Sequence, residues 1–215
     1  MIRFKNRSEA GKQLATKLTH YKNTTQSIVL GLPRGGVVTA FEVAQVLNLP
    51  LDIVVPRKIG APDNPELAIG AVTEDGSLLL DKDIVSLFHI SKQYLDQAVA
   101  EEVKEAQRRL AAYRKKRPPL NLFNKTVIIV DDGVATGLTM LAAIKSVQKK
   151  GAAYIVVAIP ITSTQALNKI QQLVDEVITL SIPKDFVAIS VFYDQFEQTT
   201  DEEVMQLMNS CRKIA

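Results

Sequence analysis

The chain has 215 residues, of which 47% are hydrophobic and 23% charged, and its formal net charge at pH 7 is +3. This length suits one well-packed domain, and we expect residues 1–215 to form a single domain rather than two. The charge falls short of the basic excess that would itself indicate nucleic-acid binding, and no apolar run is long enough to span a membrane. The first seven residues lack the apolar core of a signal peptide, so we expect a cytoplasmic protein.

Helical and strand patterns alternate along the chain. Ser8 is expected to cap a helix over residues 9–20, and helical patterns separate the strand-like runs that follow. Those runs are rich in β-branched residues and lie at 28–30, 51–55, 127–130, 154–159 and 176–180. This alternation predicts an α/β fold, a doubly wound five-stranded parallel sheet flanked by helices, which gathers the loops after its strands at one edge.

A glycine-rich turn follows the first strand-like run, with the sequence Gly31-Leu32-Pro33-Arg34-Gly35-Gly36. Its last two glycines let backbone N–H groups turn toward a phosphate, and a helix beginning near Val37 would add its positive end. The same residues would also suit a plain strand-to-helix turn, and both interpretations stay open. A Walker A motif is excluded, because Val37 and Val38 stand where Lys and Ser or Thr are required.

The middle of the chain predicts a loop, a hairpin and a long helix. Residues 60–66 are rich in breakers and should form an exposed loop, while the apolar runs 68–72 and 78–80 flank Asp75-Gly76 as in a hairpin. A helix from Ser91 to about Arg117 carries one apolar stripe, which would pair with a partner subunit or cover the sheet or the hairpin. Its basic end, 114–117, is either a solvated helix end or a patch for an anionic partner.

The most informative segment covers residues 127–140, where four apolar β-branched residues precede Asp131 and Asp132 and then a turn rich in glycine and threonine. Ionised carboxylates only accept hydrogen bonds and suit a vicinal diol, whereas Thr136, Thr139 and the N–H groups of a starting helix suit a phosphate. A ribose 5-phosphate satisfies both. The alternative is a buried strand with a solvated Asp-Asp turn and a threonine cap.

The segment from Val127 to Thr139 resembles the binding signature for phosphoribosyl diphosphate (PRPP) in type I phosphoribosyltransferases. The resemblance implies the fold of that family and assigns Asp131 and Asp132 to the ribose hydroxyls and, directly or through water, to Mg²⁺. It assigns the 5-phosphate to a loop made of Gly133, Val134, Ala135, Thr136, Gly137, Leu138 and Thr139, and pyrophosphate to Pro33, Arg34, Gly35 and Gly36. Ala135 stands where hypoxanthine-guanine members carry an acid. In this respect the chain is closer to the adenine and uracil branches.

The implied reaction moves ribose 5-phosphate from PRPP to a nitrogenous base, with a purine favoured, and releases pyrophosphate. Water must be kept from the cation-like transition state, and we expect a mobile loop over 57–74, within a hood at about 57–80, to do this. Arg57 and Lys58 are expected to reach the pyrophosphate, and Glu66 is a candidate proton acceptor. The alternative is that these are ordinary surface charges.

A second part of the hood is expected at 181–215, where aromatic residues are dense. Phe186 and Val187 resemble the base-binding pair of the purine branch, although such aromatics would equally suit a core. We expect PRPP, a nucleobase and a second copy of the chain, in a homodimer, as partners, and neither membrane nor nucleic acid. The competing hypotheses are a non-catalytic regulator that binds PRPP and acts on nucleic acid, and a hydrolase that transfers to water.

Overall fold

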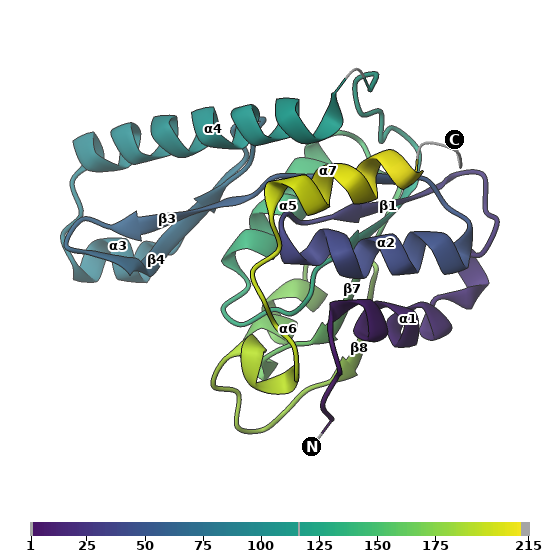
Figure 1. Cartoon of the computed structure of the whole chain (residues 1–215). Coiled ribbons are helices and arrows are strands. Elements are labelled where there is room, and N and C mark those ends of the chain that lie inside the picture. The colour runs from purple at the N-terminus through teal and green to yellow at the C-terminus, as the bar shows by residue number, and fades with distance from the viewer. Residues whose placement is uncertain (1, 116, 212–215) are drawn as a thin grey trace.

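The computed structural model describes residues 2–115 and 117–211. Its centre is a five-stranded sheet in the order β2-β1-β6-β7-β8, in which neighbouring strands are parallel (Figure 1). The strands are β1 (Ser27–Gly31), β2 (Leu51–Ile53), β6 (Thr126–Val130), β7 (Tyr154–Ile161) and β8 (Glu176–Ser181). The predicted doubly wound parallel sheet is therefore confirmed.

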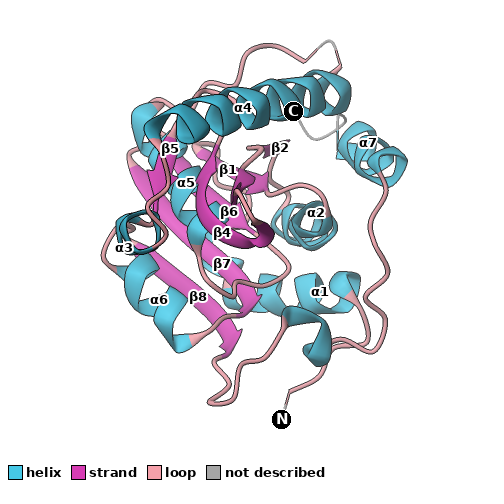
Figure 2. Cartoon of the chain, turned by 90° about the vertical axis from the view of Figure 1, so that its left-hand side faces the viewer, coloured by secondary structure: helices cyan, strands magenta, loops and turns pink. Residues whose placement is uncertain are grey.

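Helices cover both faces of this sheet (Figure 2). The helices α1 (Arg7–Lys17), α2 (Gly35–Leu47) and α7 (Asp201–Ser210) pack on one face, and α5 (Leu138–Lys149) and α6 (Thr164–Gln171) pack on the other. Successive strand residues alternate between the two cores: Val29 contacts the first helix group, and Leu30 contacts the second. Because both faces are buried, the central strands β1, β6 and β7 are apolar after their first residue.

The helix boundaries differ from the predicted ones by a few residues. Asn6 rather than Ser8 caps α1, because the Asn6 side chain accepts a hydrogen bond from the Glu9 N–H at 3.0 Å. Ser8 instead donates to Glu42 at 2.5 Å. The long helix α4 spans Lys92–Arg114 and ends before the predicted Arg117.

A second, antiparallel sheet of β3 (Arg57–Ala61), β4 (Asn64–Val72) and β5 (Leu78–Leu80) projects from the body with α3 (Lys82–Leu87) and one end of α4 (Figure 1). We call these elements the arm. The predicted hairpin is confirmed by the pairing of β4 with β5.

The prediction of an exposed loop over 60–66 was wrong, because only Pro62 and Asp63 form a turn there. The other breakers of this stretch lie in strands, where the register of β3 and β4 shifts around Gly60. Such irregular pairing accommodates Pro65, which cannot donate to a ladder. The glycine, prolines and turn-forming polar residues of this stretch therefore belong to an irregular β-hairpin rather than to a loop.

The root of the arm is fixed to α5. Ala71 of β4 packs on Leu138 at the start of that helix. Farther along, Lys150 donates to Glu74 at 2.9 Å, and Ser146 donates to Asp75 at 2.8 Å. The root of the arm therefore holds a set position relative to the loop that precedes α5.

Three parts of the predictions lie outside the described residues: Met1, Lys116 in the basic helix end, and residues 212–215 of the C-terminal hood. Within the described ranges, none of the helices combines the length and the apolar character needed to cross a bilayer.

Candidate functional site

The site lies between β1 and β6, where the strand order of the sheet reverses. β1 and β6 are neighbours, and Gly31 pairs with Val130 at their carboxyl ends. The chain leaves β1 through α2 toward β2 and leaves β6 through α5 toward β7, so the two connections diverge. Open α/β sheets bind ligands in the crevice that such a divergence creates. Both of the predicted loops lie there.

Glycines at the start of α2 let the two loops touch. A Cβ atom added to Gly36 would lie 2.5 Å from Oδ1 and 2.9 Å from Cα of Asp131. A Cβ added to Gly35 would overlap Oδ2 of Asp132 and lie 2.7 Å from Nε of Arg7. Any other residue at these positions would push the acidic pair away from the glycine turn.

The two acids have different surroundings. Asp132 is buried, its carboxylate accepts a hydrogen bond from Arg7 Nε at 2.6 Å, and its backbone carbonyl accepts one from the Tyr193 hydroxyl at 2.6 Å. Asp131 is half-buried, and its Oδ1 accepts the backbone N–H of Asp132 at 2.9 Å.

Their surroundings also change the proton affinities of the acids. Desolvation raises the pKa of Asp131 well above its usual range, and the negative charge of Asp132 raises it further. Desolvation also raises the pKa of Asp132, but Arg7 opposes that effect. The Arg7 side chain therefore offsets only part of the effect that burial and mutual repulsion have on the two acids.

The loop after the acids is anchored on one side and open on the other. Val134 donates to the Ile161 carbonyl at 2.9 Å, and the Ser163 hydroxyl donates to the Ala135 carbonyl at 2.6 Å. In the described part of the chain, no group accepts a hydrogen bond from the backbone N–H of Ala135, Thr136 or Gly137. Gly137 has a φ of 88° and immediately precedes α5; glycine adopts this conformation at little cost. Fixed, uncommitted N–H groups at a helix start suit a phosphate.

The glycine turn after β1 has the same character. No described residue accepts the backbone N–H of Arg34, Gly35 or Gly36, and the peptide bond between Pro33 and Arg34 is cis. The Arg34 side chain lies 3.7 Å from Asp201, at the start of α7. This turn therefore combines open N–H groups with a cation that is held only loosely.

Arg57, Lys58 and Glu66 lie on the arm and, among the described interactions, none of them contacts either loop. Arg57 donates to Glu102 of α4 at 2.7 Å, and Lys58 and Glu66 are exposed. The roles of Arg57 and Lys58 at the pyrophosphate and of Glu66 as a proton acceptor remain predictions.

The segment after β8 covers the acidic loop with residues other than the predicted pair. Phe186 packs on Phe192 with ring centroids 5.7 Å apart, while Val187 is 82% exposed. Ile189 lies against Gly133, because a Cβ on that glycine would come within 2.7 Å of it. The roles of Phe186 and Val187 in base binding remain predictions.

Sequence reasoning missed Arg7, Tyr193, Ile189 and Ser163. Each of them reaches the two loops from a distant part of the chain, and no local motif surrounds it. The dense aromatics of 182–196 were the one usable signal, and they pointed to this segment but not to the contacts that Tyr193 and Ile189 make.

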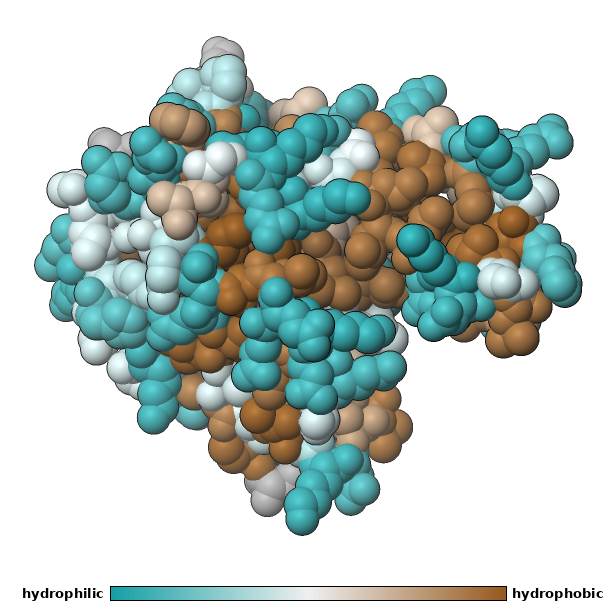
Figure 3. Space-filling model, turned by 180° about the vertical axis from the view of Figure 1, so that it is seen from behind, coloured by the Kyte–Doolittle hydropathy of each residue, from teal (hydrophilic) through white to brown (hydrophobic). Residues whose placement is uncertain are grey.

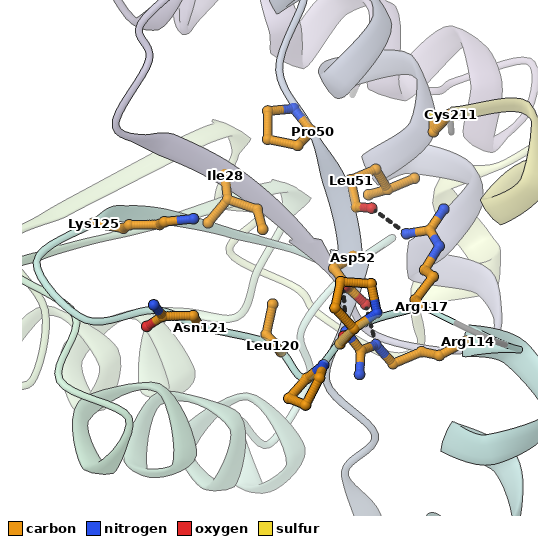
Figure 4. A pocket seen from close by; sticks show the side chains of 12 residues that line it. Ile28, Pro50, Leu51, Asp52, Arg114, Arg117, Leu120, Asn121, Lys125 and Cys211 are labelled. Carbon is orange, nitrogen blue, oxygen red and sulfur yellow. Dashed lines mark hydrogen bonds and ion pairs between the residues drawn. The ribbon is translucent and has the colours of Figure 1, made fainter. Parts of the chain in front are cut away.

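A cavity of about 590 Å³ lies elsewhere (Figure 4). Ile28, Leu51 and Lys125, which line it, are at the amino ends of β1, β2 and β6, across the sheet from both loops. Its arginines are engaged, since Arg114 makes two 2.9 Å bonds to Asp52 and Arg117 donates to the Leu51 carbonyl. These bonds join α4 and the chain after it to the sheet and account for the charges without a ligand.

The sequence and structure match known proteins. A sequence profile of the family described as "Phosphoribosyl transferase domain" matches residues 4–197. A Mycobacterium tuberculosis protein named as a phosphoribosyl transferase, found in two strains, is 40% identical over 210 residues. The match covers 98% of this chain but 47% of that protein, so the chain spans about half the length of these relatives.

Two solved structures share the fold. The protein TT1426 from Thermus thermophilus is 41% identical, with a TM-score of 0.80, over 97% of this chain and 99% of that one. A purine phosphoribosyltransferase from Pyrococcus horikoshii is 18% identical, with a TM-score of 0.50, over 90% of this chain and 91% of that one. The second likeness concerns the fold alone.

The raised pKa of Asp131 predicts a stability effect. Above the ordinary value of 3.8 the unfolded chain ionises this group readily, whereas the folded chain must ionise it beside Asp132. Its contribution to stability therefore falls as pH rises through the raised pKa. Replacing Asp131 by Asn should raise the free energy of unfolding at pH 8 by about 1–2 kcal/mol, and by less at pH 4. Urea unfolding at both pH values measures this.

Asp63→Asn, at the exposed turn of the β3–β4 hairpin, is the matched control and should change little. A variant at Asp131 that is less stable than the wild type at pH 8 would contradict the assigned electrostatics.

Proposed function

The chain belongs to the phosphoribosyl transferase domain family, and from this premise we propose that it transfers ribose 5-phosphate from PRPP to a nitrogenous base and releases pyrophosphate. The observation that carries the proposal is the meeting of two loops at the switch point of the sheet. One ends in paired carboxylates beside open N–H groups, and the other presents open N–H groups beside an arginine. PRPP has the diol, the 5-phosphate and the diphosphate that match these partners.

Each part of PRPP has a proposed place. Asp131 and Asp132 accept from the ribose hydroxyls, and the loop from Gly133 to Thr139 donates to the 5-phosphate. The turn at 33–36 takes the diphosphate through the N–H groups of its glycines and the Arg34 side chain. Because the loops touch at Gly35 and Gly36, a substrate that spans both is held with its anomeric carbon between them.

Mg²⁺ fits this donor set if the substrate completes its coordination. No three His, Cys, Asp or Glu side chains of the described residues gather to hold a metal by themselves. Mg²⁺ commonly needs only one or two carboxylates when phosphate oxygens and water supply the rest, so Asp131 and Asp132 suffice, directly or through water. When bound, the ion would neutralise charge on the diphosphate.

The protein's own share of catalysis is electrostatic. As the bond from the anomeric carbon to pyrophosphate breaks, positive charge grows on the ribose and negative charge on the leaving group. Carboxylates on the ribose side and N–H donors with Arg34 on the diphosphate side are placed to stabilise both charges. Arg57 and Lys58 are assigned to the pyrophosphate, and Glu66 is assigned as a proton acceptor. These roles require the β3–β4 hairpin to move over the site, and that movement would also exclude water.

A homodimer is part of the proposal. None of the residues of α3 is buried, and Leu87 and Phe88 at its end are 73% and 55% exposed. Apolar surface extends from the body onto the arm on the side shown in Figure 3. An exposed apolar patch of this kind is typical of an interaction surface.

The transfer reaction is tested by incubating the purified chain with PRPP, Mg²⁺ and a panel of purine and pyrimidine bases. Pyrophosphate release and nucleotide formation should rise together for one base, with purines favoured. The double variant Asp131→Asn, Asp132→Asn should bind PRPP at least about 100-fold more weakly, because it loses charge-assisted bonds to the diol and the metal. PRPP binding without turnover on any base would favour a regulator, and pyrophosphate release without a base would favour a hydrolase.

Base binding is tested at Phe186. Its replacement by Ala should raise the Michaelis constant for the base about tenfold and leave PRPP affinity nearly unchanged, because stacking on the base is lost while the two loops proposed to hold PRPP are not altered. Phe123→Ala, which removes a 67% exposed aromatic elsewhere, is the control. An equal change in both variants would leave Phe186 without a role in base binding.

The dimer is tested by sedimentation velocity. The wild type should sediment as two chains, and the double variant Leu87→Glu, Phe88→Glu as one, because two charges cannot be buried in an apolar contact. Leu173→Glu, at another exposed apolar position, should not change the mass. A monomeric wild type would exclude the dimer.

A further inference from the structure

Arg7 is brought to the site by the pairing of the two ends of the chain. Phe4 donates to the Phe192 carbonyl and accepts from the Asp194 N–H, both at 2.9 Å, so residues before α1 run beside the segment after β8. Asn6 then caps α1 and fixes where the helix starts. Arg7 is its first residue, and its position over the loops is therefore set by backbone bonds on both sides.

Three contacts hold the Arg7 guanidinium in one plane. Nε donates to Asp132 at 2.6 Å, Nη1 donates to the Glu197 carbonyl at 2.8 Å, and Cζ lies 3.7 Å from the centroid of the Phe196 ring. The side chain is only 12% exposed. An arginine held by a carboxylate, a carbonyl and an aromatic face is preorganised, unlike a cation on a mobile surface chain.

The same guanidinium borders the glycine turn after β1. A Cβ on Gly35 would lie 2.7 Å from Nε and 3.1 Å from Nη2 of Arg7, so the backbone of that residue and the guanidinium are in contact. Nη2 bonds to no acceptor among the described residues. It lies beside Gly35, and the N–H groups of Gly35 and Gly36 are also without an acceptor among the described residues.

We propose that Arg7 binds the substrate: it holds Asp132 in place for the ribose and donates from Nη2 to the diphosphate. A diphosphate brings several negative charges to a turn whose own cation, Arg34, lies 3.7 Å from Asp201. Arg7 supplies a second cation that is already in position and that touches both loops. This inference rests on the proposed function, because it assumes that the glycine turn takes a diphosphate.

The test separates a substrate contact from a purely structural ion pair. Binding of pyrophosphate with Mg²⁺ is measured by calorimetry for Arg7→Gln, for Asp132→Asn and for the two changes together. Arg7→Gln should weaken pyrophosphate binding about 10- to 100-fold, since a charge-assisted bond is lost. Asp132→Asn removes a group assigned to Mg²⁺ and a contact that holds Arg7, so it changes the affinity on its own account. The effect of Arg7→Gln is therefore compared within each background.

The double variant decides the matter. If Arg7 contacts the diphosphate, Arg7→Gln costs about as much pyrophosphate affinity in the Asp132→Asn chain as in the wild type. If Arg7 serves only as the counter-ion of Asp132, adding Arg7→Gln to the Asp132→Asn chain has no further effect on pyrophosphate affinity, and the proposal is overturned. The double variant also avoids leaving a buried carboxylate unpaired, so it stays informative if Arg7→Gln alone unfolds.

Two further variants sharpen the result. Arg7→Lys keeps the charge without the planar fork, and it should recover only part of the pyrophosphate affinity. Arg3→Gln removes an exposed ion pair with Asp194 in the same segment, 2.5 Å long. Because exposed pairs of this kind contribute little, the affinity should stay unchanged. A loss in Arg3→Gln equal to that in Arg7→Gln would show a general effect of charge and contradict the proposal.

The outcomes also distinguish this proposal from the proposed function. The wild type could bind pyrophosphate and transfer ribose 5-phosphate to no base, while Arg7→Gln weakens pyrophosphate binding. That result would contradict the transfer reaction and support a contact between Arg7 and the diphosphate. A wild type that binds no pyrophosphate would overturn both.

Discussion

The close approach of two loops at the carboxyl ends of β1 and β6 is the constraint on which the site depends. The parallel pairing of these strands fixes where the loops begin, and the missing side chains of Gly35 and Gly36 let the acidic pair lie against the glycine turn. With a Cβ at either position, the carboxylates and the open N–H groups would be separated. One ligand could then no longer contact both loops without a change in the sheet.

This arrangement opposes the stability of the empty protein. Asp131 and Asp132 bring two negative charges together in a poorly solvated place, and desolvation raises the pKa of each. Arg7 bonds to Asp132, and its charge also acts to lower the pKa of Asp131, but desolvation and the charge of Asp132 outweigh that effect at Asp131. A metal and a substrate diol would relieve what remains, so the same repulsion that destabilises the empty site favours binding.

Local patterns in the sequence were enough to predict the sheet and the positions of the two loops, because runs of β-branched residues favour strands and glycines favour turns whatever their tertiary contacts. They misled at 60–66, where breakers lie in a bulged hairpin that only the pairing of β3 with β4 defines. Arg7 could not be found this way. Its contact with Asp132 joins residues 125 positions apart, and its neighbourhood reads as an ordinary helix start.

The C-terminal segment links the two arginines of the site. The carbonyl of Glu197 accepts from Arg7, and the carboxylate of Asp201 lies 3.7 Å from Arg34 while it accepts from the Tyr113 hydroxyl of α4. The groups that contact the two arginines, Glu197 and Asp201, are therefore only four residues apart, on the segment that leads into α7. A diphosphate that draws Arg34 away from Asp201 would leave that carboxylate bonded to the Tyr113 hydroxyl. Because the other end of α4 belongs to the arm, this contact links the site to the arm, in addition to the contacts that fix the root of the arm to α5.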